Sequence, residues 1–121
     1  MKPTPKAKLL QKPKTMTVSV GGIPYKVAFL PWKNVDHANK AEHLFGQVDY
    51  IQHSINIASD VPKEKQQISL IHEVLHAIIS EYNIKELMNE QRDHSEHAID
   101  QLSLGILSFL TSIKAEVPYG S

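Results

Sequence analysis

Short runs of alternating apolar and polar residues occupy the first half of the chain, and this period of two is typical of half-buried β-strands. Two such runs, at residues 17–20 and 23–30, flank Gly21-Gly22, which predicts a hairpin with a two-residue turn. Two more runs follow at residues 48–52 and 55–57. The pattern therefore predicts a small antiparallel sheet of three or four strands.

From about residue 60 the apolar residues recur in steps of three and four, the spacing of amphipathic helices. We expect one long helix over residues 62–82, with Asp60 as its N-cap and Asn83 as its left-handed end. A second long helix is expected over residues 93–113. The expected core-facing residues are Ile68, Ile71, Leu75, Ile78 and Tyr82, flanked by Leu70, Val74 and Ala77, in the first helix, and Ile99, Leu102, Ile106, Phe109 and Ile113 in the second. A small sheet followed by two long packed helices predicts the α+β class.

The two ends of the chain differ from its centre in composition. Residues 1–14 are rich in Lys and Pro and predict a disordered basic tail, whereas residues 114–121 predict a frayed C-terminal tail. Residues 15–113 are then a single domain. Within it, residues 34–45 are ambiguous: Ala38, Ala41, Leu44 and Phe45 have helical spacing, and Asp36 could cap a short helix.

Composition limits the chemistry that the chain can perform. The 121 residues include no cysteine, which excludes zinc ribbons, thiol catalysis and disulfide frameworks and leaves His, Asp and Glu as the strong metal ligands. No stretch approaches the roughly 20 apolar residues that span a bilayer, and the N-terminus lacks the apolar centre of a secretory signal. We therefore expect a cytoplasmic protein without a membrane segment.

The net charge is zero, but its distribution is uneven. Residues 1–35 contain seven Lys and no acidic residue, so the remainder of the chain carries the compensating negative charge. A basic arm of this kind can contact nucleic acid or an acidic partner. The absence of interleaved aromatic residues and of an Arg cluster favours a solubilising tail over a nucleic-acid surface.

The sequence His72-Glu73-Val74-Leu75-His76 lies inside the first predicted helix. Residues four apart lie on one helix face, so His72 and His76 can bind one metal ion between their imidazole rings. Glu73 is then beside the metal and free to act as general base toward a metal-activated water. Polar groups in so apolar a helix need partners, and a metal ion would supply one.

A third ligand is expected at the start of the second helix, where His94, Glu96 and His97 are the candidates. Glu96 is favoured because Asp100 lies one turn further on, where it can accept a hydrogen bond from the outer nitrogen of His72. The competing interpretation is that Glu96 and Asp100 belong to the solvent face of the helix.

A second group is usually needed to stabilise the oxyanion of a hydrolysis reaction. The candidates for this role, or for contacts with the substrate, are His53, Tyr82, His94 and His97. An edge strand beside the site could bind an extended substrate as an additional strand, and residues 48–53 are the candidate segment.

The order of these motifs over residues 15–113 resembles the small gluzincin-type metallopeptidase domains of phages and prophages, related to the ImmA/IrrE class. The residues that carry the resemblance are Gly46-Gln47-Val48-Asp49-Tyr50, Ile55-Asn56-Ile57, Gln66-Gln67, HEVLHAI from His72, Glu96, Asp100, Leu102 and Gly105. The resemblance implies a zincin-like fold with one Zn²⁺ held by His72, His76 and Glu96 and with Glu73 as base. His97 stands where another acid is expected, and Ile79 and Tyr82 replace the Gly and His of metzincins, which excludes that branch.

The expected function is thus a zinc-dependent metallopeptidase that hydrolyses peptide bonds in a protein or peptide substrate. Two alternatives stay open. One is a non-catalytic zinc-binding regulatory module of a phage or prophage. The other is a nucleic-acid-associated protein with a structural metal site. The sequence does not determine the oligomeric state.

Overall fold

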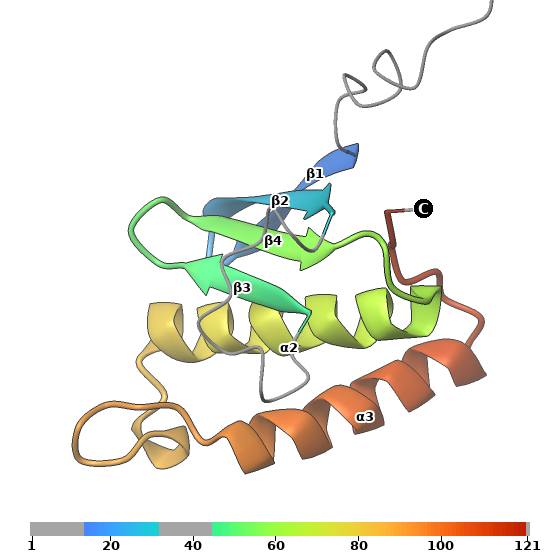
Figure 1. Ribbon diagram of the computed structural model, residues 1–121. Helices are drawn as coiled ribbons and strands as arrows, with labels where there is room; N and C mark the ends of the chain where they lie inside the picture. The colour runs from blue at the N-terminus through green and yellow to red at the C-terminus, as the bar shows by residue number, and fades with distance from the viewer. Residues whose placement is uncertain (1–13, 32–44, 121) are drawn as a thin grey trace, which may run out of the picture.

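The computed structural model describes residues 14–31 and 45–120. A four-stranded sheet lies on one side of the first long helix, and the second long helix lies on its other side (Figure 1). The elements are β1 (Lys14–Val20), β2 (Ile23–Leu30), β3 (Gly46–Asp49), β4 (Ser54–Ala58), α2 (Lys63–Tyr82), η3 (Lys85–Leu87) and α3 (Glu96–Ser112). The predicted α+β class is confirmed.

The sheet is mixed, with the order β1-β2-β4-β3. The predicted hairpin is confirmed: β1 and β2 pair antiparallel around Gly21 and Gly22, which have positive φ angles of 60° and 83°. β3 and β4 also pair antiparallel, but β2 and β4 are parallel, so the expectation of an entirely antiparallel sheet is wrong. Alternation along a strand identifies its buried face but not its direction relative to a neighbour, which is why the pattern could not reveal this pairing.

The core lies between the sheet and α2. Leu70 and Ala77 of α2 are buried against side chains of the central strands, including Tyr25, Phe29 and Ile57. The face of α2 that contacts the sheet is therefore the expected flank, not the expected main stripe. Of that stripe, Ile71 is buried but Tyr82 is 63% exposed.

The two ends of α2 are capped in different ways. Its N-cap is Pro62, without a side-chain hydrogen bond, so the expectation of Asp60 as cap is wrong. Buried Gln66 holds this turn instead, because its Nε2 donates to the carbonyls of Ser59 and Val61. Asn83 ends the helix in the left-handed conformation, as expected, and its N–H bonds to carbonyls of the last turn.

α3 begins three residues later than expected. Met88 and His94 form an isolated antiparallel bridge that keeps residues 88–94 out of the helix. Ser95 then caps α3, and its Oγ accepts a hydrogen bond from the Ala98 N–H. Among the apolar residues expected to face the core, Ile99 is fully buried, whereas Phe109 is 61% exposed.

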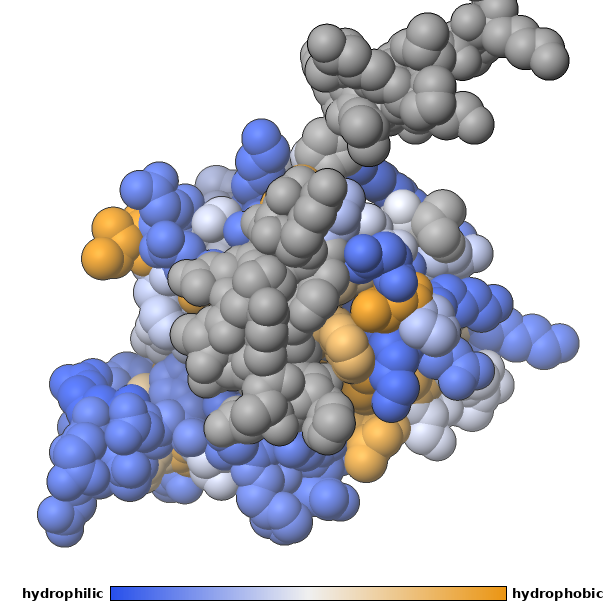
Figure 2. All heavy atoms as spheres, viewed as in Figure 1, coloured by the Kyte–Doolittle hydropathy of each residue, from blue (hydrophilic) through white to orange (hydrophobic). Residues whose placement is uncertain are grey.

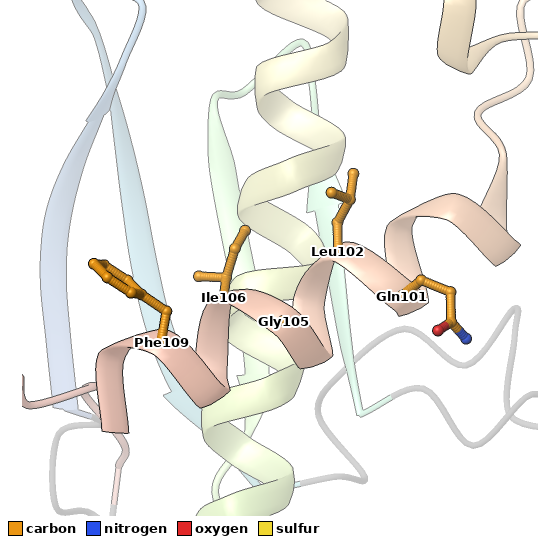
Figure 3. Close-up of a pocket in the computed structure, with 5 residues that line it drawn as sticks. All are labelled: Gln101, Leu102, Gly105, Ile106 and Phe109. Carbon is orange, nitrogen blue, oxygen red and sulfur yellow. The ribbon is translucent and has the colours of Figure 1, made fainter. Parts of the chain in front are cut away.

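Several apolar residues on one side of α3 are exposed or half-buried, and Leu104, on another side, is 57% exposed. Figure 3 shows Leu102, Ile106 and Phe109 projecting from the same side, with Gly105 between them. Leu102 and Ile113 are 43% and 56% exposed. Of the expected core-facing stripe of the second helix, Ile99 is thus buried, whereas Leu102, Phe109 and Ile113 lie on the surface. Hydrophobic side chains also gather on the face of the molecule seen in Figure 2, over the helices and amid a largely hydrophilic surface.

The C-terminal segment packs on the domain, so the expectation of a frayed tail is wrong for residues 114–120. Val117 is buried, and its carbonyl accepts a 2.8 Å hydrogen bond from Gln67 Nε2. The Gly120 N–H donates to Gln66 Oε1. A Cβ atom at Gly120 would lie 2.2 Å from Phe29 Cβ, so only glycine allows this close approach.

Two expectations fall outside the described residues. The first is the predicted basic tail, of which only Lys14, in β1, is described. The second is the ambiguous segment at residues 34–45, of which only Phe45 is described. Within the described residues, no helix combines the length and the apolar character required to cross a membrane.

Candidate metal centre

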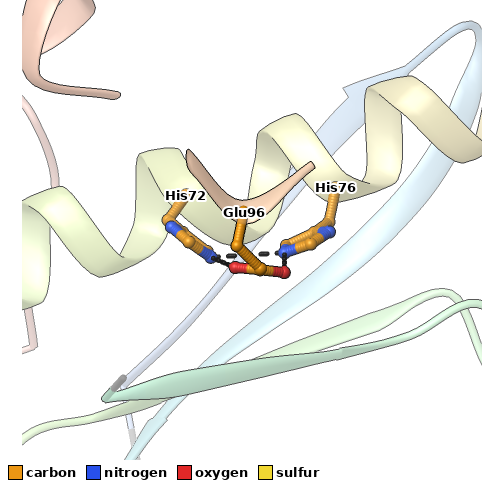
Figure 4. Close-up of side chains that lie close together, drawn as sticks. All are labelled: His72, His76 and Glu96. Carbon is orange, nitrogen blue, oxygen red and sulfur yellow. Dashed lines mark hydrogen bonds and ion pairs between the residues drawn. The ribbon is translucent and has the colours of Figure 1, made fainter. Parts of the chain in front are cut away.

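His72 and His76 lie one turn apart on α2, and the first residue of α3, Glu96, lies across from both rings (Figure 4). His72 Nε2 is 3.0 Å from Glu96 Oε2, and His76 Nε2 is 2.9 Å from Glu96 Oε1. The two Nε2 atoms are 3.2 Å apart. Two imidazole nitrogens and one carboxylate thus converge on a single point between the helices.

This geometry fits a zinc ion. In a tetrahedral zinc site with bonds of about 2.0–2.1 Å, neighbouring donor atoms are about 3.3 Å apart. The two Nε2 atoms, 3.2 Å apart, are close to this value, and each lies within 3.0 Å of one of the two carboxylate oxygens of Glu96. One ligand atom from each of the three residues lies within 4.8 Å of the others. These three residues are the group that could hold a metal ion within the described part of the chain. Three donors leave the fourth tetrahedral position for a substrate or water.

The outer nitrogen of each histidine has its own partner. His72 Nδ1 lies 3.0 Å from Asp100 Oδ1, the contact expected from the one-turn spacing of Glu96 and Asp100. His76 Nδ1 lies 2.8 Å from His94 Nδ1. If each outer nitrogen carries the proton and donates to its partner, both Nε2 lone pairs point at the position between the helices.

The surroundings keep His76 neutral. Burial, together with the smaller effects of the neighbouring His72 and His94, lowers the pKa of His76 to about 3. Burial also lowers the pKa of His94, against an opposing effect of Asp93. Neutral imidazole is the form that binds a metal, so little proton release is required at His76 for binding.

Glu73 is buried beside the three donors. It lines a cavity of about 180 Å³ together with His76, Glu96 and residues of β3. Burial, followed by the negative charge of Glu96, raises the pKa of Glu73 to about 8. A bound divalent cation would lower this pKa again, because it stabilises the nearby carboxylate. The carboxyl group of Glu73 is therefore positioned to exchange a proton near neutral pH.

A glycine allows β3 to pass close to Glu73. A Cβ atom at Gly46 would lie 2.7 Å from Ile57 Cδ1, 3.0 Å from the Asn56 carbonyl and 3.2 Å from Glu73 Cγ. The strand and the catalytic candidate share this space only because residue 46 has no side chain. Gly46 is among the residues that carry the family resemblance, but the sequence alone indicated no role for it.

Two further residues of this cavity, Gln47 and Tyr50, were not among the expected site residues. Burial raises the pKa of the Tyr50 hydroxyl, and the charges of Glu73 and Glu96 raise it further. Gln47 Oε1 is buried without a hydrogen-bond partner among the described residues. In the sequence Tyr50 belongs to the alternating run 48–52 and to the candidate substrate segment 48–53, whereas Gln47 precedes both. The path of β3 over α2 brings both residues to the site.

The expected oxyanion or substrate contacts are mostly elsewhere. His53 Nε2 lies 3.8 Å from Glu81, near the last turn of α2, and its ring is next to Tyr25. Tyr82 is largely exposed, and His97 is exposed and outside the donor group. His94 does reach the site, but on the outer side of His76, where its ring also contacts Tyr50 with centroids 5.8 Å apart.

The centre therefore consists of three donors, a buried carboxyl group and a cavity bounded by an edge strand. Each histidine donor has a partner at its outer nitrogen. Comparisons with protein family models, with curated proteins and with solved structures found no match to this chain. The interpretation of the site accordingly depends on its own geometry and donor chemistry.

Proposed function

We propose that this protein is a zinc-dependent peptidase, with Zn²⁺ held by His72, His76 and Glu96. The observation that carries the proposal is the position of Glu73, which is buried in the cavity that His76 and Glu96 also line. A purely structural zinc site has four protein ligands and needs no adjacent carboxyl group. The donor set and a separate proton-exchanging group in one cavity together support hydrolysis.

Zinc, when bound, lowers the pKa of water toward 7 and polarises a carbonyl group, which is the chemistry required for hydrolysis of an amide. Glu73 takes the proton of the attacking water as the new carbon–oxygen bond forms. It then returns this proton to the leaving nitrogen as the carbon–nitrogen bond breaks. Glu73 thus ends the cycle in the same protonation state in which it began.

The proposed substrate is an extended segment of a protein or peptide that pairs with β3. β3 is an edge strand, and three of its four residues, Gly46, Gln47 and Val48, line the cavity of Glu73. Edge strands bind extended peptides through main-chain hydrogen bonds. The candidate segment was 48–53, but the strand ends at Asp49, and residues 50–53 form the turn to β4. Gln47, with its unpaired buried oxygen, can accept a hydrogen bond from a substrate N–H.

Tyr50 is the proposed donor to the oxyanion. Its raised pKa keeps the hydroxyl protonated throughout the neutral range, and it lines the same cavity as Glu73. A neutral hydroxyl can donate to developing negative charge without itself losing a proton. A cytoplasmic location belongs to the same proposal, supported by a sequence that uses no cysteine.

The test combines metal content with activity. The parent protein should bind one zinc ion and cleave an unstructured protein substrate, whereas His76→Ala and Glu96→Ala should lose the metal. Glu73→Gln should retain the metal and lose about 100- to 10,000-fold in kcat.

Each outcome of this test has a distinct meaning. Zinc binding without cleavage of any unstructured substrate would favour the non-catalytic zinc module. Full activity in Glu73→Gln would refute the assignment of the base. Retention of zinc by Glu96→Ala would refute the proposed third ligand.

A further inference from the structure

The exposed side of α3 has no charged residues after Asp100, and no other element of the described residues packs on it. From Gln101 to Ile113 the chain contains no Lys, Arg, Asp, Glu or His. Leu102, Phe109 and Ile113 are nevertheless 43%, 61% and 56% exposed. Surface helices normally place charged residues on their solvent side, and contiguous apolar patches on a surface mark interaction sites. The composition of α3 is therefore that of an interface.

Six apolar residues, half-buried or exposed, form one contiguous stripe, which we define as the α3 stripe. At 100° per residue, its members lie within an arc of about 100° on the helix. They are Ala98, Leu102, Gly105, Ile106, Phe109 and Ile113. Leu104, which is 57% exposed, lies on another side of the helix and does not belong to the stripe. The acidic residues of the helix, Glu96 and Asp100, contact His72 on α2 and lie off this arc. Uncharged Gln101, Ser108 and Ser112 border the stripe and would form a polar rim.

The stripe continues into an apolar groove between the two helices. This groove has a volume of about 300 Å³ and is lined by Leu75 and Ile78 of α2 and by Ile106 and Leu110 of α3, among others. Ile106 also belongs to the α3 stripe, so the two apolar surfaces are continuous. A stable dimer buries about 800 Å² on each partner, and the stripe with the groove extends along all of α3, about 25 Å.

The order of residues along the stripe is self-complementary. Two copies of α3 in antiparallel orientation, related by a two-fold axis between Gly105 and Ile106, bring Leu102 opposite the partner's Phe109. The same register brings Gly105 opposite the partner's Ile106 and Ala98 opposite the partner's Ile113. Each of the six positions then has an apolar partner. In two of the three pairings, a small residue receives a large one.

The space at Gly105 supports this register. A Cβ atom at Gly105 would meet nothing within 4 Å in the monomer. No packing inside the monomer thus requires glycine, although glycine destabilises a helix interior. A facing isoleucine would require this small residue, because it allows the two helices to approach closely.

From these observations we propose that the protein is a homodimer in which two α3 helices pair antiparallel through the α3 stripe. The interface is isologous, as in most symmetric dimers. The result is a four-helix arrangement in which the two α3 helices pair at the centre, each beside its own α2. The proposal is independent of the metal and of peptidase activity.

The first test is the mass of the full chain in solution, measured by light scattering after gel filtration over a range of concentrations. The parent should have twice the 13.6 kDa mass of the monomer. Phe109→Asp should have the monomer mass because a buried charge opposes pairing. Ile51→Asp is the matched control, since Ile51 is 89% exposed in the β3–β4 turn, and it should remain dimeric. A parent that is monomeric at every concentration would overturn the proposal.

The second test examines the register. Gly105→Leu has free space in the monomer, so it should fold and bind metal like the parent but should shift toward the monomer. The chain has no cysteine, so introduced thiols are unique. A mixture of Leu102→Cys and Phe109→Cys proteins should form disulfide-linked dimers on oxidation, whereas either variant alone should not. Cross-linking of each cysteine variant with itself would indicate a parallel pair of helices and would overturn the proposal. Dimers that persist in both Phe109→Asp and Gly105→Leu would place the interface elsewhere and would also overturn it.

Discussion

Nδ1 of His76 lies 2.8 Å from Nδ1 of His94, and the two rings stack with their centroids 5.0 Å apart. His94 therefore positions His76 in the way that Asp100 positions His72. Partners of this kind fix the tautomer of a ligand, and their loss typically reduces metal affinity 10- to 100-fold. We expect His94→Ala to bind zinc about 10- to 100-fold more weakly than the parent.

His97→Ala is the matched control for this variant, because His97 is exposed on the first turn of α3 and lies outside the donor group. Zinc affinity can be measured by competition with a chelating dye. Cobalt substitution would report whether the coordination geometry changes. Equal losses of affinity in His94→Ala and His97→Ala would show that the local fold, rather than the ring of His94, determines the effect.

Gly46→Ala should disturb both the fold and the site. The added methyl would lie 2.7 Å from Ile57 Cδ1 and 3.2 Å from Glu73 Cγ. Overpacking of this kind costs about 1–3 kcal/mol of folding stability. Denaturant unfolding of the metal-loaded protein would measure this cost, and peptidase assays should show a loss of kcat caused by displacement of Glu73.

The double variant Gly46→Ala with Ile57→Val separates the two effects. Valine removes the Cδ1 atom nearest to the added methyl, so part of the lost stability should return. The contact with Glu73 Cγ remains, and kcat should stay low. Recovery of kcat in the double variant would contradict a direct effect of the methyl on Glu73.

Gln47→Met should affect stability and activity in opposite directions. The buried Oε1 of Gln47 has no partner among the described residues, and such an atom costs roughly 1–3 kcal/mol. Replacing the amide with a thioether of similar size should therefore raise the free energy of unfolding by about 1 kcal/mol. If the oxygen binds a substrate N–H, kcat/KM should fall about two- to tenfold. An unchanged kcat/KM would remove Gln47 from the proposed substrate site.

Tyr25 should determine part of the stability at alkaline pH. Its buried hydroxyl donates a 2.6 Å hydrogen bond to Glu81 Oε1, and burial, followed by this bond and the charge of Glu81, raises its pKa. In the unfolded chain tyrosine ionises near pH 10. The unfolded state therefore loses its proton first, and the free energy of unfolding should fall as the pH rises above about 10.

Tyr25→Phe should reduce this alkaline dependence. It should also cost about 1–3 kcal/mol at neutral pH, because Glu81 loses its partner. Tyr82→Phe is the control, since Tyr82 is 63% exposed, and its alkaline profile should match that of the parent. Chemical unfolding at a series of pH values measures both effects. A Tyr25→Phe profile as steep as that of the parent would contradict the assignment.

Local sequence patterns were sufficient for much of the fold. The hairpin at Gly21-Gly22 and the left-handed end at Asn83 follow from glycine and asparagine at positions with positive φ. The proximity of His72, His76 and Glu96 could also be predicted from spacing. His72 and His76 lie one helical turn apart, and a short linker places the second helix antiparallel beside the first. These features depend on residues close together in sequence or on regular geometry.

Features that depend on distant packing were not visible in the sequence. The direction of β4 relative to β2, the buried faces of both helices and the docking of residues 114–120 all result from contacts between distant segments. Gln47 faces the site for the same reason, because β3 passes over α2, whereas Tyr50 lies in the segment 48–53 that was expected beside the site. Periodicity reveals that a residue has an apolar environment, but it does not reveal which element provides that environment.

The shallow burial of α3 has a thermodynamic consequence. In the described part of the chain only Ile99 and Ser103 of this helix are fully buried, yet its first turn supplies Glu96 to the donor group on α2. An ion bound there would tie the least anchored helix to the rest of the domain. Amide hydrogens of α3 should therefore exchange with solvent sooner than those of α2 once a chelator is added, and zinc should slow their exchange more than that of the sheet. Metal binding would then slow amide exchange along the whole length of α3, including residues far from the atoms that bind the ion.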